Sequence, residues 1–209
     1  MTTLEVETPH GPARVLLRPA ADPRAALVLG HGAGGGVDVP DLVAATEAAL
    51  AREVSVALVE QPYRVAGRRS SPPPPRLDAA WTAVVDLLRE RELAGLPLIA
   101  GGRSAGARVA CRTAEATGAT AVLCLAFPLE PPARGNKPPQ SRLDELDLVT
   151  VPTLVVQGER DRFGMPPPGP SRQVVAVRGD HSLKSDLEAV GAAVSGWLAD
   201  VTLAQPARS

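Results

Sequence analysis

Short apolar segments rich in valine and leucine recur along the chain and alternate with helix-like segments. A run that is apolar at nearly every residue and ends at glycine or proline is typical of a strand buried on both faces of a sheet. Six such runs occur: Ala25–Gly30, Val54–Val59, Leu96–Gly101, Thr120–Ala126, Thr153–Gln157 and Gln173–Val177. Strands that alternate with helices predict a parallel sheet covered by helices on both faces.

Two further segments at the start of the chain break this alternation. Thr3–Thr8 and Ala13–Arg18 flank the turn signal His10-Gly11-Pro12, which indicates an antiparallel hairpin. Helical spacing of apolar residues occurs over 41–52, 77–88 and 183–201. We therefore expect an α/β fold with a mostly parallel sheet of about seven or eight strands, in a single domain over residues 1–209.

The composition excludes several kinds of protein. A net charge of −1 on 209 residues gives no general attraction to nucleic acid. The first residues lack the basic and apolar parts of a signal peptide, and the longest apolar stretch, 119–129, is too short to span a bilayer. Cys111 and Cys124 belong to no metal-binding motif, so both are expected to be buried thiols. These features favour a cytoplasmic monomer or homodimer without a membrane or nucleic-acid partner.

Ser104 lies at the centre of Gly102-Arg103-Ser104-Ala105-Gly106, between a predicted strand and a predicted helix. In sheets of this kind ligands bind beyond the carboxyl ends of the strands. A nucleophilic serine there needs a strained strand-to-helix turn, and residues two positions away must be small. The spacing therefore predicts a nucleophile elbow with Ser104 as the nucleophile and with Gly102 and Gly106 as its small neighbours.

A serine hydroxyl also needs a base to take its proton, and the chain has three histidines. The predicted hairpin turn puts His10 on the wrong side of the sheet, and His31 is expected to brace its own loop. His181 follows the last strand, and it fits the chain order serine, acid, histidine of hydrolases built on such a sheet. We therefore predict His181 as the base.

The acid that orients the base is expected after the preceding strand, at Asp161 in Gln157-Gly158-Glu159-Arg160-Asp161. Glu159, Asp180 and Glu130 are the alternatives. Glu159 begins the turn, and Asp180 is adjacent to the histidine along the chain.

The glycine-rich loop His31-Gly32-Ala33-Gly34-Gly35-Gly36 follows the strand Ala25–Gly30. Small residues let the backbone approach a substrate carbonyl, so the N–H groups of Ala33 and Ala105 are the predicted oxyanion hole. The residues predicted to contact the substrate are Gly32, Gly34, Arg103 and Pro128. The alternative is a phosphate-binding loop, but Gly-Lys-Ser/Thr is absent and only Glu60 could bind a ribose.

Several segments together resemble a known family: Gly30–Gly35, Gly101–Ala110, Phe127–Leu129 with Pro131-Pro132, Pro152–Gly164 and Gly179–Leu183. They are similar to the lid-less α/β-hydrolases related to dienelactone hydrolase. The likeness is greatest to a hydrolase family that bacteria share with an animal testis-expressed protein and a subunit of a chromatin acetyltransferase complex. The resemblance implies the α/β-hydrolase fold and a triad of Ser104, Asp161 and His181. Dienelactone hydrolases use a cysteine nucleophile, so Ser104 makes that activity doubtful.

Arginine and proline gather in the segments that follow strand ends. Residues 62–76 contain Arg64, Arg68, Arg69 and Arg76 and no acid, and residues 131–142 contain Arg134, Lys137 and Arg142 and no acid. One hypothesis is an anionic acyl substrate, and the alternative is codon bias. Proline clusters at 72–75, 131–132, 138–139 and 166–170 are expected to stiffen loops on the same edge as Ser104.

The leading hypothesis is a serine hydrolase that cleaves a carboxylic ester or thioester of a small-molecule acyl substrate. It needs neither a metal nor an organic cofactor. The alternatives are an amidase or acyltransferase with the same residues, and a non-catalytic interaction protein that keeps the fold.

Overall fold

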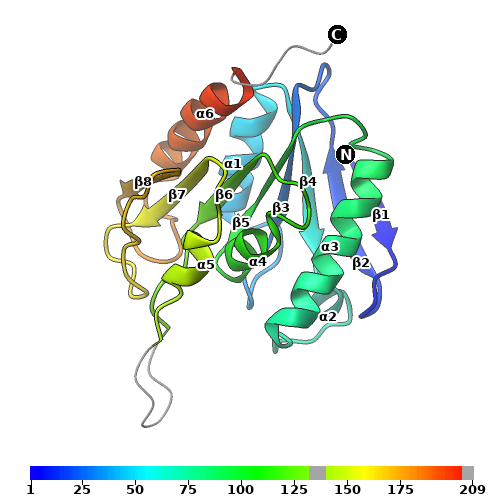
Figure 1. The fold of residues 1–209 in the computed structure, drawn as a ribbon, viewed down its shortest axis with the longest axis horizontal. Coiled ribbons are helices and arrows are strands. Elements are labelled where there is room, and N and C mark those ends of the chain that lie inside the picture. The colour runs from blue at the N-terminus through cyan, green and yellow to red at the C-terminus, as the bar shows by residue number, and fades with distance from the viewer. Residues whose placement is uncertain (132–139, 204–209) are drawn as a thin grey trace.

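The computed structural model describes residues 1–131 and 140–203, in which eight strands form one sheet (Figure 1). The strand order is β1-β2-β4-β3-β5-β6-β7-β8. The strands are β1 (Thr2–Val6), β2 (Ala13–Arg18), β3 (Ala25–Gly30), β4 (Val54–Glu60), β5 (Leu98–Arg103), β6 (Ala121–Leu125), β7 (Thr153–Gly158) and β8 (Arg172–Val177). Strands β3 to β8 pair in parallel, and β1 and β2 pair antiparallel. The predicted mostly parallel sheet with an antiparallel hairpin is confirmed.

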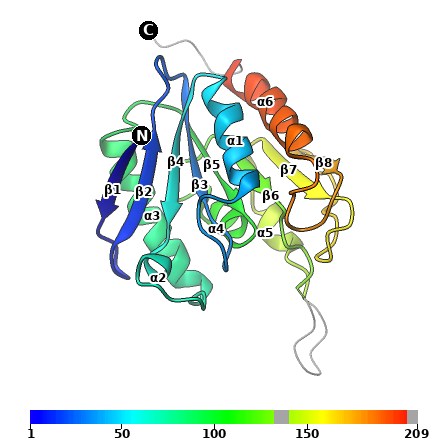
Figure 2. The same ribbon diagram turned by 180° about the vertical axis from the view of Figure 1, so that it is seen from behind.

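The described helices cover both faces of the sheet, as Figures 1 and 2 show from opposite sides. They are α1 (Pro40–Leu50), α2 (Pro62–Val65), α3 (Pro74–Glu90), α4 (Ala105–Thr113), α5 (Leu143–Asp147) and α6 (Leu187–Leu203). Trp81 of α3 and Val109 of α4 belong to the apolar core on one face. Leu42 of α1 and Trp197 of α6 belong to the core on the other face. The near-continuous apolar pattern of the central strands follows from this double burial.

Two predicted element boundaries are wrong for local reasons. Strand β5 begins at Leu98 and ends at Arg103, two residues later than expected, so Ser104 follows the strand directly. Leu96 is instead part of a turn, in which its N–H donates to the Leu93 carbonyl, and Pro97 has no N–H for the ladder. Helix α6 begins at Leu187 and not at Leu183, because Leu183 has φ 51°.

The N-terminal hairpin turn lies at the same edge of the sheet as Ser104, which corrects the expected position of His10. Arg14 of β2 pairs with Glu60 of β4 in antiparallel register, so the turn before β2 adjoins the carboxyl end of β4. Strands β4 and β3 still separate this turn from β5.

The proline-rich segment 166–170 does not stay at the catalytic edge as expected. Its last residue, Pro170, lines a cavity with Thr120 and Pro152, at the amino ends of β6 and β7. The chain must cross to this edge because β8 runs parallel to β7. Pro74 and Pro75 form the first turn of α3, and the prolines at 132, 138 and 139 lie outside the described residues.

Both cysteines are free and buried, with their sulfur atoms 3.5 Å apart. The hydrogen bond to Cys111 and burial raise the pKa of the Cys124 thiol. Within the described part of the chain, no helix is both long and apolar enough to cross a membrane.

Candidate active site

Ser104 forms the sharp turn between β5 and α4. Its backbone has φ 52° and ψ −107°, a strained conformation that costs a residue with a side chain about 1–3 kcal/mol. The Ser104 N–H donates to the Leu125 carbonyl of the neighbouring strand at 2.9 Å, which ties the turn to the sheet. The strain is therefore fixed by the packing around it, as expected of a residue whose side chain must be held in one place.

The two glycines of the turn lie where no side chain fits. A Cβ at Gly102 would lie 2.6 Å from the Gly30 carbonyl oxygen and 2.7 Å from the Gly106 carbonyl carbon. A Cβ at Gly106 would overlap the same Gly30 carbonyl group. These neighbours are backbone atoms, which cannot rotate away as a side chain can. The Gly-x-Ser-x-Gly spacing is thus a consequence of the close approach of α4 to the end of β3.

Hydrogen bonds join Ser104 to His181 and Asp161 in a continuous chain. His181 Nε2 lies 2.9 Å from Ser104 Oγ, and His181 Nδ1 lies 2.8 Å from Asp161 Oδ2. The Asp161 side chain is 0% exposed and the His181 side chain 20% exposed, so solvent reaches the base but not the acid. The Phe163 ring also packs against the imidazole in a T-shaped contact, with 4.5 Å between the ring centroids. The structure therefore brings together the three side chains that the sequence singled out.

Two further groups hold the Asp161 carboxylate. The Phe163 N–H donates to Oδ1 at 2.9 Å, and Gln157 Nε2 donates to Oδ2 at 2.9 Å. Gln157 is fully buried in β7 and was not singled out from the sequence. The available signal was a lone amide at the end of an otherwise apolar strand. Its amide thus holds the acid from the end of β7.

The three alternative acids, Asp180, Glu159 and Glu130, are not bonded to the His181 ring in the described part of the chain. Asp180 Oδ1 accepts bonds from the N–H and the hydroxyl of Ser182, at 2.8 and 2.7 Å. Glu159 and Glu130 are exposed. Within the described residues, Asp161 is the carboxylate bonded to the His181 ring.

The glycine-rich loop 31–36 lies over the N-terminus of α4. Ala33 is exposed, and its carbonyl oxygen accepts a bond from the Tyr63 hydroxyl at 3.0 Å. A Cβ added to Gly34 would have no atom within 4 Å, whereas Gly32 packs against the Arg103 side chain. Ala105 begins α4, and the first N–H groups of a helix have no acceptor within it. The loop and the helix start thus both present backbone beside Ser104.

His31 connects the glycine-rich loop to the end of β4. Its Nδ1 lies 2.7 Å from the Gly32 carbonyl, and the Gln61 N–H donates to Nε2 at 3.1 Å. One ring nitrogen is a donor and the other an acceptor, so the ring is neutral. Burial lowers the pKa of His31, which favours the same state. This is the contact pattern of a residue that braces the loop.

Two residues expected to touch the substrate are engaged elsewhere. Arg103 donates to Asp41 Oδ2 at 2.8 Å and to the His181 carbonyl at 2.9 Å. Pro128 is buried, and its carbonyl accepts a bond from Arg142 at 3.0 Å. The sequence could not reveal these three hydrogen bonds, because each joins residues that are separated along the chain.

The phosphate-binding alternative loses its ribose ligand in the structure. Glu60 forms an ion pair with Arg14 at 3.0 Å across the β2–β4 pairing. Among the described residues, no group of three or more histidine, cysteine, aspartate or glutamate side chains is arranged to hold a metal ion. Of the basic residues in the segment 131–142, Arg134 and Lys137 lie outside the described residues.

Residues 23–189 match the family model described as alpha/beta hydrolase domain. Among solved structures, the chain is similar to XC6422 from Xanthomonas campestris, described as a serine hydrolase without a lid, with a TM-score of 0.78 and 18% identity over 98% of this chain and 96% of that one. It is also similar to Est1E from Butyrivibrio proteoclasticus, with a TM-score of 0.77 and 16% identity over 98% of this chain and 100% of that one. A dienelactone hydrolase from Anabaena variabilis gives a TM-score of 0.75 and 16% identity over 95% and 96%. No curated protein matches the sequence.

Proposed function

The chain belongs to the alpha/beta hydrolase domain family, and on this premise we propose that it is a serine hydrolase that cleaves a carboxylic ester or thioester. The observation that carries the proposal is the hydrogen-bonded chain from Ser104 Oγ through His181 to the buried Asp161. A strained serine, an imidazole within bonding distance and a buried carboxylate behind it are the parts of a nucleophilic triad.

In the proposed reaction Ser104 Oγ attacks the acyl carbonyl carbon while His181 Nε2 takes the hydroxyl proton. The imidazolium then gives this proton to the leaving alcohol or thiol as the bond to the carbonyl carbon breaks, which leaves an acyl-serine. A water molecule attacks the acyl-serine, His181 takes its proton and returns it to Ser104 Oγ, and the carboxylic acid departs. Asp161 holds the imidazole and stabilises its positive charge.

The negative charge on the carbonyl oxygen is stabilised in this proposal by the N–H groups of Ala33 and Ala105. Fixed backbone donors stabilise such an oxyanion without reorganisation during the reaction. The Tyr63 bond to the Ala33 carbonyl and the His31 bond to Gly32 support it, since both restrict the loop that carries the first donor.

Labelling with a fluorophosphonate tests the proposal directly. The intact protein is expected to take up one phosphonyl group per chain, located on the Ser104 peptide by mass spectrometry, because this reagent reacts with activated serines. Heat-unfolded protein is the control and should remain unlabelled. Failure of the folded protein to react would favour a non-catalytic interaction protein on the same fold.

We further propose that the substrate carries an anionic group. A cavity of about 390 Å³ lies between the hairpin turn, α2 and the start of α3, at the same edge of the sheet as Ser104. Its lining includes His10, Arg68 and Arg76 and no carboxylate, and its wall residue Tyr63 is bonded to the Ala33 carbonyl. None of the arginines of 62–76 has a carboxylate within 4.0 Å in the described part of the chain. Unpaired cations in a concave surface attract anions.

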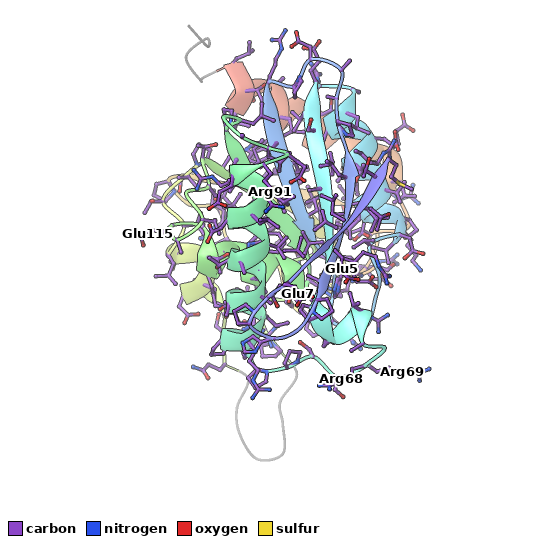
Figure 3. All side chains as sticks on the ribbon, turned by 90° about the vertical axis from the view of Figure 1, so that its right-hand side faces the viewer. Glu5, Glu7, Arg68, Arg69, Arg91 and Glu115 are labelled. Atoms are coloured by element: carbon purple, nitrogen blue, oxygen red, sulfur yellow. The ribbon has the colours of Figure 1, made fainter. Side chains whose placement is uncertain are left out.

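Replacing Arg68 and Arg76 with glutamine is expected to lower kcat/KM about tenfold for an ester with a terminal carboxylate, because the cavity loses its positive charge. kcat/KM for a neutral ester of equal length should stay within about twofold. The double variant Arg91→Gln/Arg52→Gln is the control, since it removes the same charge away from the cavity. Figure 3 shows Arg68 at the lower end of the view and Arg91 well above it. Equal losses for both esters would contradict an anion-binding cavity.

We also propose that the chain is a member of the hydrolase family shared with the testis-expressed protein and the chromatin-complex subunit. We propose a single domain over residues 1–209, a cytoplasmic location and a monomer or homodimer. The proposed reaction uses only groups of this chain, the substrate and water.

A further inference from the structure

Arg103 is the last residue of β5 and directly precedes Ser104 in the chain. Its side chain is 17% exposed and turns away from the solvent toward α1. Nε donates to Asp41 Oδ2 at 2.8 Å, and Nη2 donates to the His181 backbone carbonyl at 2.9 Å. A Cβ at Gly32 would lie 2.8 Å from Nη1, so the guanidinium also packs on the glycine-rich loop. One side chain thus contacts three separate parts of the site.

Asp41 fixes the position of this guanidinium. Its side chain is 0% exposed, in the first turn of α1, and its second oxygen accepts a bond from the Leu42 N–H at 3.0 Å. Burial raises the pKa of Asp41, and the neighbouring Arg103 opposes that shift. A carboxylate in the interior needs a partner of fixed geometry. The planar guanidinium can bond Asp41 and the His181 carbonyl in two directions at once, which an ammonium group cannot reproduce.

The His181 carbonyl is the backbone group of the residue whose ring bonds Ser104. The contacts form a closed circuit, from Ser104 through the peptide bond to Arg103, across to the His181 carbonyl, and back through the imidazole to Ser104 Oγ. On the other side, the His181 loop is bonded to the turn that follows β7, where the Arg160 N–H donates to the Gly179 carbonyl at 2.9 Å. The circuit thus links the base to the nucleophile by a path that does not include Asp161.

We propose that Arg103, held by Asp41, is a positioning residue that keeps the His181 imidazole in line between Asp161 and Ser104. This inference rests on the proposed serine-hydrolase function. A displacement of about 1 Å between reacting groups costs a rate of the order of 10²-fold. The polar contacts of the circuit are made between protein groups, so the effect is expected on kcat more than on KM.

The test compares Arg103→Lys and Asp41→Asn with Arg112→Lys as a matched control. Arg112 makes an equally close, partly buried pair with Asp78 at 2.9 and 2.6 Å, on the side of α4 that faces α3. Within the described part of the chain, Arg112 makes its side-chain hydrogen bonds and ion pairs with Asp78 and Glu145 and none with the triad. Arg103→Lys keeps the positive charge beside Asp41 and so preserves folding better than a neutral replacement would. Each variant is measured at a temperature where circular dichroism shows it folded.

With a neutral short-chain ester, Arg103→Lys and Asp41→Asn are expected to lower kcat about 10- to 100-fold with KM within about twofold. The fluorophosphonate labelling rate should fall in parallel. In the NMR spectrum, the downfield His181 Nδ1–H signal should broaden or vanish in these variants. Arg112→Lys should leave kcat, the labelling rate and this signal unchanged.

Three outcomes would overturn the inference. A kcat within threefold of wild type for Arg103→Lys would mean that the circuit does not set the geometry. A rise in KM alone would assign Arg103 to substrate binding. An equal loss of kcat in Arg112→Lys would mean that the loss reflects general destabilisation and not the position of His181. A wild-type protein that neither hydrolyses the ester nor takes up the label would refute the proposed function itself, and the inference with it.

Discussion

Replacing Ser104 with alanine is expected to lower kcat for a short-chain ester by about 10⁴- to 10⁶-fold, with the fold intact. The hydroxyl is the proposed nucleophile, and without it His181 has no oxygen to deprotonate except that of water. Alanine tolerates the strained φ of 52° no worse than serine, because both have a Cβ. The free energy of unfolding should therefore change by less than about 1 kcal/mol. Fixed-time assays at high protein concentration measure the residual rate of ester hydrolysis.

The pattern of losses among the three residues distinguishes a triad from separate contributions. If Ser104 and His181 act as one unit, the double variant Ser104→Ala/His181→Ala should be no slower than Ser104→Ala alone. Ser195→Ala is the control variant. The Ser195 hydroxyl lies on α6, far from the site, and accepts a bond from Arg52. The kcat of this variant should match that of the wild type. Additive losses in the double variant would argue against the proposed proton transfer between Ser104 and His181.

The sequence predicted the parts of the site that depend on local sterics and on strand direction. The elbow glycines have a steric cause within a few residues, so their spacing can be recognised without a structure. His181 and Asp161 follow from strand order, because the carboxyl ends of parallel strands meet at one edge. The same reasoning failed for His10, since β2 is antiparallel and brings the start of its strand to that edge.

The contacts of the supporting side chains Arg103 and Gln157 could not be predicted by such reasoning. Arg103 bonds Asp41 and His181, which lie 62 and 78 positions away. The sequence indicated only a charged residue at the elbow, which suggested a substrate contact. Gln157 was hidden similarly, because its polarity at the end of an apolar strand has meaning only once Asp161 lies beside it. The supporting residues of the site therefore required the structure, whereas the three residues of the proposed triad could be predicted from the sequence.

Gly106→Ala is expected to lower the free energy of unfolding by about 3 kcal/mol, the upper range for an overpacked core position. The new methyl group would overlap the Gly30 carbonyl and lie 2.9 Å from the His31 carbonyl oxygen. Both are backbone groups at the end of β3 and the start of the glycine-rich loop, so relief requires α4 to move off the sheet. Urea denaturation of the folded protein measures the change.

The same movement should reduce catalysis beyond the loss of stability. Shifting α4 displaces the Ala105 N–H relative to the Ala33 N–H, and a shift of about 1 Å costs kcat of the order of 10²-fold. Gly196→Ala is the matched control, because this glycine lies in α6 with nothing within 4 Å of its Cβ direction. Alanine there should raise the free energy of unfolding by about 0.5–1 kcal/mol and leave kcat unchanged. A loss of stability at Gly106 and a gain at Gly196 would show that close packing excludes a side chain at Gly106. A Gly106→Ala variant as stable and active as wild type would contradict this, because α4 could then accommodate a methyl group.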